Sequence, residues 1–443
     1  MSHAISKDLL QSFADTIHTD SSHKAAQRAV TLNNIYPVAG NNTLSATNTT
    51  IFSDELETGS VTDQKSSGRC WLFAHLNVIR HQIAKDNNLD DIELSQSYSF
   101  FWDKLEKSNT FYERIIASAD APLDDRWVQY ILDAPQFDGG WWEYAASLIE
   151  KYGVVPKSAM PESEATSDSH QLNTLLNHKL RKDALALRDL VSKHTPATKV
   201  QSTKEAMLQE VYRILTIAIG TPPAQFDFVF KDKDKKYHRQ DAITPTEFLK
   251  KYYKQSVTEY VSLLNDPSES KSYNQAYTFE HDGNVIDGVS PLFLNVDMQT
   301  LKDLTQAQIK AGESVWFGCD VGADSSKKGF MSLDTFDFNS TFGVDFSLSK
   351  ADRLASRDSS VTHAMTITGV DIVAGEAKQW KVENSWGEKR GKNGYYTMSS
   401  DWFDKNGYVV VIRQDLLPEA LKEALKKPAI TIPSWDPLNS LPG

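Results

Sequence analysis

The chain has 443 residues, of which 40% are hydrophobic and 24% charged, as is usual for a globular protein large enough to hold more than one domain. Its formal net charge of −12 opposes nucleic-acid binding, which depends on basic residues that neutralise phosphates, so no nucleic-acid partner is expected. No apolar run of about 18 residues or more is present, so we expect no membrane span.

Cysteine usage and the first residues predict a cytoplasmic location. Two cysteines, Cys70 and Cys319, are too few for a disulfide framework. The N-terminus also lacks the basic start, apolar stretch and cleavage site of a signal peptide.

The N-terminal part of the chain divides into an arm and a helical region. Residues 1–50 have the pattern of a helix followed by the polar stretch "AGNNTLSATNTT", which predicts an arm on the surface. Residues 51–160 are expected to contain the nucleophile, with further helices predicted over 94–107 and 138–156.

The stretch "QKSSGRCWLFA" predicts a cysteine at the start of a helix. Ser66 and Ser67 are suitable N-caps, which would place Cys70 in the first or second turn. Apolar residues then follow a 3.6-residue period on one face of the helix. These are Leu72, Leu76, Ile79 and Ile83.

The rest of the chain changes from helical to strand periodicity. Residues 161–285 contain two strong helical periods and a capping box that begins at Thr244, which predicts a helical insertion. Residues 286–415 alternate with period two in "THAMTITGV" and "QWKVENSWG", each predicted to be a strand with a turn at "VAGEAKQ" between them. Residues 416–443 are predicted to be a C-terminal helix and tail.

Four residues have the types and contexts that thiol catalysis needs. A cysteine attacks a carbonyl as its thiolate, and the N-terminus of a helix at Cys70 would favour that charge. His363 opens one predicted strand and Asn384 ends the next, so a hairpin could place the imidazole and an orienting amide side by side. Gln64 is positioned to donate to a developing oxyanion.

These residues carry a resemblance to papain-like cysteine proteases. The stretch "SGRCW" matches their nucleophile signature except for its first cysteine, and "LSQ", "DGGWW", "HAMTITGV" and "ENSWG" follow in the expected order. The interval from Cys70 to His363 is about twice the usual 130 to 150 residues, and the predicted insertion accounts for the surplus. End to end, the chain resembles the bleomycin hydrolase and aminopeptidase C family.

The resemblance implies an α+β, papain-like fold with a helical left domain, an antiparallel barrel-like right domain, a large helical insertion and a C-terminal arm. Residues 51–160 would form the left subdomain and 286–415 the right one. Residues 161–285 would serve oligomerisation, and the family assembles as a homohexamer. Residues 416–443 would place a tail in the active site.

The resemblance also implies roles for residues around the nucleophile. Gly139 and Gly140 would pair with the substrate backbone, and Trp386 would shield the Asn384 amide and border the substrate site. The carboxylate of Gly443 would hold the amine of the substrate. No metal or cofactor motif is present, so none is expected.

The predicted function is therefore a cytoplasmic cysteine aminopeptidase that acts on peptides through an acyl-enzyme. An oligopeptide endopeptidase of the same family is the alternative, because the ending Leu441-Pro442-Gly443 differs from the small-residue ending associated with the aminopeptidases. A non-catalytic hexameric scaffold is a third hypothesis.

The other cysteine and two further histidines are interpreted as structural residues without a catalytic role. Cys319 is expected to be a buried thiol. His75 and His81 are rejected as the base because they lie on the helix of the nucleophile, where the ring could not face the sulfur.

Overall fold

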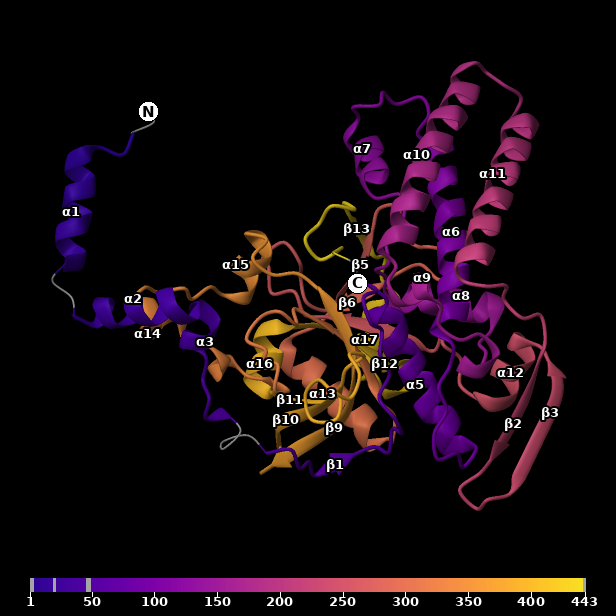
Figure 1. Ribbon diagram of the computed structural model, residues 1–443. Helices are drawn as coiled ribbons and strands as arrows, with labels where there is room; N and C mark the ends of the chain where they lie inside the picture. Colours follow the sequence, from indigo (N-terminus) through magenta and orange to yellow (C-terminus); the bar gives the residue numbers. More distant parts are fainter. Residues whose placement is uncertain (1–3, 19–20, 45–48, 441–443) are drawn as a thin grey trace.

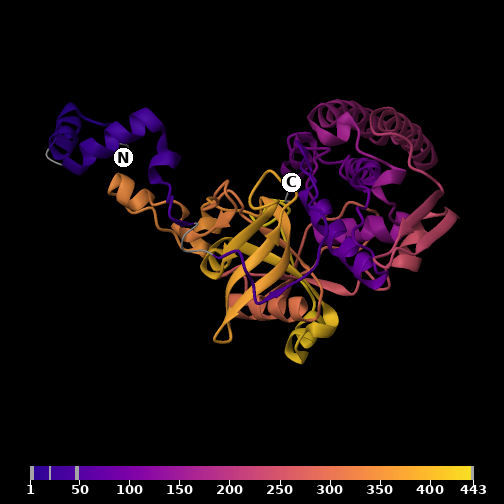
Figure 2. The ribbon, with the colours of Figure 1, turned by 60° about the horizontal axis from the view of Figure 1, so that its bottom comes forward.

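The computed structural model describes residues 4–18, 21–44 and 49–440, which form an N-terminal arm, a helical lobe and a β lobe (Figures 1 and 2). The arm stands away from the body, and its described part contains three helices where one was predicted. These are α1 (Lys7–His18), α2 (Ser21–Asn33) and α3 (Ile35–Ala39).

The helical lobe surrounds helix α5, which starts at Cys70 and is buried along most of its length. Helix α6 packs against α8, α10 and α11, and α10 and α11 lie side by side, joined by the turn at residues 193–196 (Figure 1). The elements are α5 (Cys70–Asp86), α6 (Gln96–Ala117), α7 (Arg126–Asp133), α8 (Trp142–Tyr152), η1 (Lys157–Ala159), α9 (Glu164–Ser167), α10 (His170–Ser192), α11 (Ala197–Ala218), β2 (Phe226–Lys231), β3 (Tyr237–Ile243) and α12 (Pro245–Tyr252).

The β lobe is built on one large sheet with the strand order β13-β5-β6-β4-β12-β7-β9-β10-β11-β8, and β1 also pairs with β9. Most pairs are antiparallel, whereas β4/β6, β5/β13 and β8/β11 are parallel. The strands are β1 (Asp54–Glu55), β4 (Tyr260–Leu264), β5 (Gln275–Phe279), β6 (Phe293–Asn295), β7 (Val315–Cys319), β8 (Phe330–Met331), β9 (His363–Val373), β10 (Glu376–Glu383), β11 (Tyr395–Ser399), β12 (Gly407–Arg413) and β13 (Ile430–Ile432).

Short helices cover the sheet and lead into the C-terminal tail. They are α13 (Met298–Lys310), η2 (Leu333–Thr335), α14 (Phe338–Phe342), α15 (Lys350–Ala355), α16 (Ser400–Asn406), η3 (Gln414–Leu416) and α17 (Glu419–Leu425). Helix α5 packs directly against β9 and β7, so the nucleophile helix and the central strands of the sheet meet at one interface. No helix of the described ranges is long and apolar enough to cross a membrane.

Several local predictions can be compared with the structure. The capping box at Thr244 and Glu247 is confirmed and starts α12. The two predicted strands are β9 and β10, but they extend into the predicted turn and leave only Ala374 and Gly375, both with positive φ, to reverse the chain. Strands β4 and β5 precede residue 286 and belong to the main sheet, so the segment predicted as a helical insertion also contributes strands to that sheet.

Candidate active site

Cys70 is the first residue of helix α5, and its side chain is fully buried. The backbone amide of Ala364 donates a hydrogen bond to Sγ over 3.4 Å. Burial raises the pKa of the Cys70 thiol to about 12, although hydrogen bonds from the backbone amides of Ala364, Trp71 and Cys70 favour the thiolate. The thiol therefore keeps its proton until a neighbouring base accepts it.

The predicted N-caps of this helix were wrong, because Arg69 occupies the cap position and no side chain caps the helix. Ser67 Oγ instead donates to the carbonyl of Gln64 at 2.7 Å and accepts from Arg69 Nε at 2.8 Å. The buried Arg69 guanidinium also binds both carboxylate oxygens of Glu162, at 3.3 and 2.9 Å. The turn before the nucleophile is thus held by a buried ion pair.

His363 opens strand β9, and Asn384 directly follows β10, which pairs with β9. His363 Nε2 lies 2.9 Å from Asn384 Oδ1, which also accepts from the backbone amide of Ser385 at 2.8 Å. Because Oδ1 only accepts, Nε2 carries the proton and Nδ1 is the basic nitrogen. The hairpin brings the two predicted residues together, and the contact with Asn384 leaves Nδ1 available to act as a base.

Trp386 lies against the imidazole, with its ring centroid 4.7 Å from that of His363. Burial lowers the pKa of His363 to about 4, and the hydrogen bond to Asn384 opposes this shift. The imidazole is therefore neutral at pH 7. Burial thus keeps the thiol and the ring uncharged when each is considered alone, and transfer of the thiol proton would create two charges that compensate each other.

Gln64 is fixed between the nucleophile turn and the residue after Asn384. Its Nε2 donates to the carbonyl of Ser67 at 2.6 Å, and its Oε1 accepts from Ser385 Oγ at 2.5 Å. An amide nitrogen has two protons, so one Nε2 donor remains for a further acceptor.

The segment that contains Gly139 and Gly140 borders the site beside the nucleophile helix. A Cβ at Gly140 would lie 2.7 Å from the Trp71 indole, so only glycine fits beside the nucleophile helix. The carbonyl of Gly139 accepts from Lys107 Nζ at 2.7 Å. Among the described residues, no hydrogen bond uses the backbone of Gly140, which leaves its amide and carbonyl for an extended ligand.

Asp138 holds this segment against the nucleophile turn. Its carboxylate accepts from the amide of Gly68 at 3.0 Å, pairs with Lys104 at 2.8 Å and accepts from Asn173 at 2.7 Å. Burial alone would raise the pKa of Asp138, but Lys104 and the hydrogen bonds hold it below its ordinary value. The sequence offered no signal for Lys104 or Asn173, because both are remote from the motif that they support.

A second ion pair involves Glu383, the residue directly before Asn384. Arg80 Nη2 on helix α5 is 2.6 Å from Glu383 Oε1, and both side chains are 1% exposed or less. His81 Nε2 lies 3.1 Å from the other Glu383 oxygen. Burial raises the pKa of Glu383, but Arg80 and His81 outweigh it and hold the value below the ordinary one. The pair links the helix of the nucleophile to the strand that carries Asn384.

The C-terminal tail crosses the site as far as the structure describes it. Trp141 Nε1, beside Gly140, lies 3.5 Å from Asn439 Oδ1, and Ser440 Oγ donates to the carbonyl of Val361 at 2.8 Å. Val361 lies two residues before His363, so the tail spans from the helical wall to the β wall. Gly443 lies outside the described residues.

His75 and Cys319, which the sequence did not favour as catalytic residues, are both buried in the core. His75 stacks on Trp142 at a centroid distance of 3.6 Å, and neither ring nitrogen has a hydrogen-bond partner among the described residues. Cys319 is fully buried in β7, where it lies opposite His363 in the pairing of β7 with β9. Within residues 4–18, 21–44 and 49–440, no cluster of three or more His, Cys, Asp or Glu residues could hold a metal ion.

The buried His75 gives a testable pH dependence of stability. Burial lowers its pKa from 6.5 to about 3. Between these values the unfolded chain binds a proton that the folded chain excludes, so His75 destabilises the fold increasingly as the pH falls. Relative to the parent, His75→Phe should gain about 1.4 kcal/mol of unfolding free energy per pH unit on acidification below the unfolded pKa.

Urea unfolding at about pH 7 and pH 5 measures this difference. His178→Phe serves as the control, because His178 is exposed on α10. A stability difference between His75→Phe and the parent that does not change with pH would contradict the assignment.

Comparison with known proteins places the chain in a family. The model of the peptidase C1-like family matches residues 4–439. The chain belongs to that family and is a cysteine peptidase. It is 44% identical over 442 residues to an aminopeptidase C of Listeria innocua, with 100% of each chain covered. It is also 44% identical over 439 residues to an aminopeptidase W of Lactobacillus delbrueckii subsp. lactis, with 99% of this chain and 100% of the relative covered.

A solved structure agrees with this assignment. The crystal structure of PepW from Lactobacillus rhamnosis HN001 matches over 100% of both chains, with 46% sequence identity and a TM-score of 0.97. The predicted α+β, papain-like fold and the suspected family are confirmed.

Proposed function

We propose that the protein is a cysteine aminopeptidase that removes N-terminal residues from peptides, with its C-terminal tail limiting access to the cleft. The tail position carries this proposal, because Asn439 and Ser440 bridge the two walls beside the nucleophile. The last three residues can reach at most about 10 Å beyond Ser440. A carboxylate of Gly443 within that reach would bind the free amine of a substrate and leave no room for a longer N-terminal extension.

The chemistry follows from the four residues around the thiol. The thiol proton of Cys70 passes to His363 Nδ1, and Sγ attacks the peptide carbonyl carbon. The backbone amide of Cys70 and Gln64 Nε2 donate to the resulting oxyanion. The imidazolium, oriented by Asn384, then gives its proton to the leaving amine, and an acyl-enzyme remains.

Water completes the reaction in the second half. His363 removes a proton from a water molecule, and the oxygen attacks the thioester carbonyl. Collapse of the second tetrahedral intermediate breaks the C–S bond, returns the proton to Cys70 and releases the amino acid. In this scheme the backbone of Gly140, with Gly139 beside it, aligns the substrate, and Trp386 keeps water away from the imidazole.

An oligopeptide endopeptidase is the alternative, favoured by the Leu441-Pro442-Gly443 ending. One experiment separates the two. The intact protein and a variant that lacks residues 440–443 are compared on a free-amine fluorogenic peptide and on its N-acylated form. The intact protein should cleave the free-amine peptide at least about tenfold faster, because a lost charged hydrogen bond costs about that factor, and truncation should abolish the preference.

Ser440→Ala is the matched control, since it removes the anchoring hydrogen bond but keeps the terminal residues. It should retain most of the preference for the free amine. Equal cleavage of both substrates by the intact protein would reject the aminopeptidase proposal. An unchanged preference after truncation would show that the terminus does not hold the amine.

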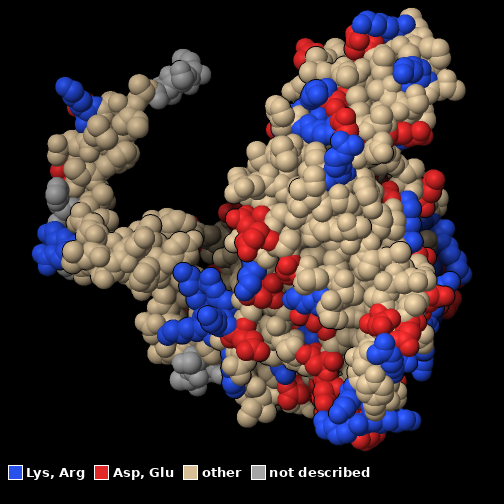
Figure 3. Space-filling model, turned by 45° about the vertical axis from the view of Figure 1, so that its right-hand side comes forward, with Lys and Arg blue, Asp and Glu red and all other residues tan. Residues whose placement is uncertain are grey.

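We also propose that the protein forms a homohexamer and acts in the cytoplasm, and the N-terminal arm supports the self-association. Figure 3 shows the arm standing away from the body with a largely uncharged surface on the face in view. Apolar side chains along and just before α1 are more than two-fifths exposed, as is typical of a surface that contacts another chain. They are Ile5, Leu9, Leu10, Phe13 and Ile17.

A further inference from the structure

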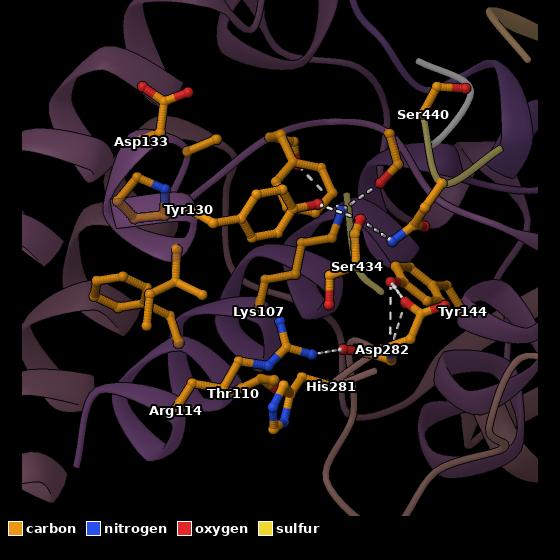
Figure 4. A pocket seen from close by; sticks show the side chains of 18 of the residues that line it. Lys107, Thr110, Arg114, Tyr130, Asp133, Tyr144, His281, Asp282, Ser434 and Ser440 are labelled. Carbon is orange, nitrogen blue, oxygen red and sulfur yellow. Dashed lines mark hydrogen bonds between the residues drawn. The ribbon is translucent and has the colours of Figure 1, made fainter. Parts of the chain in front are cut away.

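A large cavity adjoins the candidate active site on its helical side. It has a volume of about 590 Å³ and lies between α6, α7, the loop at residues 280–283 and the tail (Figure 4). Gly68 and Gly139 line it where it meets the nucleophile turn, and Ser434 and Ser440 of the tail line another side. The tail therefore forms a wall of this cavity as well as crossing the cleft.

One face of helix α6 runs along the cavity from the cleft to its far end. Lys107 Nζ donates to the carbonyl of Gly139 at 2.7 Å, and Arg114 Nη2 donates to the carbonyl of Gly283 at 2.9 Å. Seven residues of helix separate these two anchors, which corresponds to about 10 Å. The cavity is therefore deep enough to take a long side chain that enters at Gly139.

The lining of the cavity includes a carboxylate without a cationic hydrogen-bond partner. Asp282 Oδ1 accepts from the hydroxyl of Tyr144 and from the amide of Gly283 at 2.8 Å. Asp282 Oδ2 is buried and has no hydrogen-bond partner among the described residues. Such an oxygen is costly to bury unless a ligand supplies the missing donor.

The positive groups of the lining do not cancel this carboxylate. The ammonium of Lys107 is occupied by Asp103 at 2.9 Å and by the carbonyls of Phe137 and Gly139. Burial raises the pKa of Asp282, and Arg114 opposes this shift only from a distance, because its own hydrogen bond goes to the backbone carbonyl of Gly283.

Two further carboxylates add to the negative charge of the lining. Asp133 and Glu280 are exposed and form no ion pair within the described ranges. The lining is therefore net acidic, which favours a cationic ligand over an anionic one.

We propose that this cavity receives the side chain of the substrate's N-terminal residue and selects lysine and arginine through Asp282. The inference rests on the proposed aminopeptidase function, because in that reaction the residue acylating Cys70 is the N-terminal one. A lysine or arginine side chain that enters beside Gly139 would donate to the carboxylate of Asp282, whose side chain would turn to present it, and would bury its methylenes against the aromatic rings of the lining.

The test compares fluorogenic amides of arginine, lysine, norleucine and glutamate. Norleucine matches lysine in length without the charge. The parent enzyme should show kcat/KM values for arginine and lysine at least about tenfold above that for norleucine, the factor expected for one charge-assisted hydrogen bond. Asp282→Asn should remove this advantage and leave norleucine cleavage unchanged.

Asp133→Asn is the matched control, because it removes an exposed carboxylate from the rim of the same cavity. It should keep the preference for basic residues. If Asp282→Asn does not fold, inhibition of the parent enzyme by arginine amide and norleucine amide gives the same comparison. Arginine amide should then be the stronger competitor.

A parent enzyme that prefers norleucine or glutamate would overturn the proposal, as would an Asp282→Asn variant that loses activity equally on all four substrates. The N-acylated arginine and norleucine amides separate this result from a failure of the proposed function. Equal cleavage of acylated and free substrates with a retained arginine preference would reject the aminopeptidase but keep the pocket. Faster cleavage of the free substrates than of the acylated ones, without a preference for arginine over norleucine, would reject only the proposed role of the pocket.

Discussion

Replacement of Cys70 by alanine is expected to lower kcat/KM by about 10⁴-fold or more, because loss of a nucleophile removes the covalent route altogether. The thiol accepts a hydrogen bond from the Ala364 amide at the start of β9, one residue from the proposed base. Steady-state kinetics on a free-amine fluorogenic substrate measures the effect, and thermal unfolding confirms that the variant is folded.

Cys319→Ala is the matched control, because Cys319 is the other cysteine of the chain and is equally buried. It should retain the kcat of the parent. A chloromethyl-ketone or epoxide reagent should label the parent once and Cys70→Ala not at all. Undiminished activity of Cys70→Ala would instead support the scaffold hypothesis, with the measured activity coming from a contaminant or another group.

Breaking the Arg80–Glu383 pair is expected to have the largest effect on stability. In Glu383→Gln the buried guanidinium keeps its charge and loses its 2.6 Å partner, while the more exposed Asp91 stays 3.1 Å away, so the cost should approach the about 3–5 kcal/mol of a broken buried pair. Activity should fall as well, because Glu383 directly precedes Asn384. The midpoint of urea unfolding and kcat are the two measurements.

Glu376→Gln provides the comparison, because Glu376 on the same strand pairs with Lys378 at 2.6 Å while both side chains are more than half exposed. That exposed pair should contribute at most about 1 kcal/mol. The double variant Arg80→Met/Glu383→Met should recover part of the lost stability, since an apolar pair avoids the buried charge but also removes the bonds of Arg80 to Asn77 and to the Ser60 carbonyl. Equal effects of Glu383→Gln and Glu376→Gln would show that the buried pair does not hold the two elements together.

The catalytic constellation was accessible to sequence reasoning because its members occur in short motifs with local signals. The cysteine begins an apolar helical period, and His363 and Asn384 sit at the adjacent ends of two alternating segments. By contrast, the Arg80–Glu383 pair joins residues about 300 positions apart. The sequence around either residue contains no signal that predicts its partner. Pairing of that kind depends on how α5 docks on the sheet.

The predictions of the fold that were wrong also have local causes. Tyr260–Leu264 is buried at every position, so its apolar run lacks the alternation that marks a strand with one exposed face. It was therefore included in a helical insertion. Ser66 and Ser67 have suitable side chains for an N-cap, but Ser67 Oγ is used by Gln64 and Arg69, and the helix starts later.

The hairpin of β9 and β10 has a consequence for how this protein could be divided. His363 and Asn384 both lie on or next to that hairpin, after the α10–α11 turn at residues 193–196. Cys70 and Gln64 both lie before this turn in the sequence. A chain opened at that exposed turn would yield one fragment with the nucleophile and another with the base and its orienting amide. Neither fragment would hold a complete reaction centre, so reassembly of the two would act as the switch of a split enzyme.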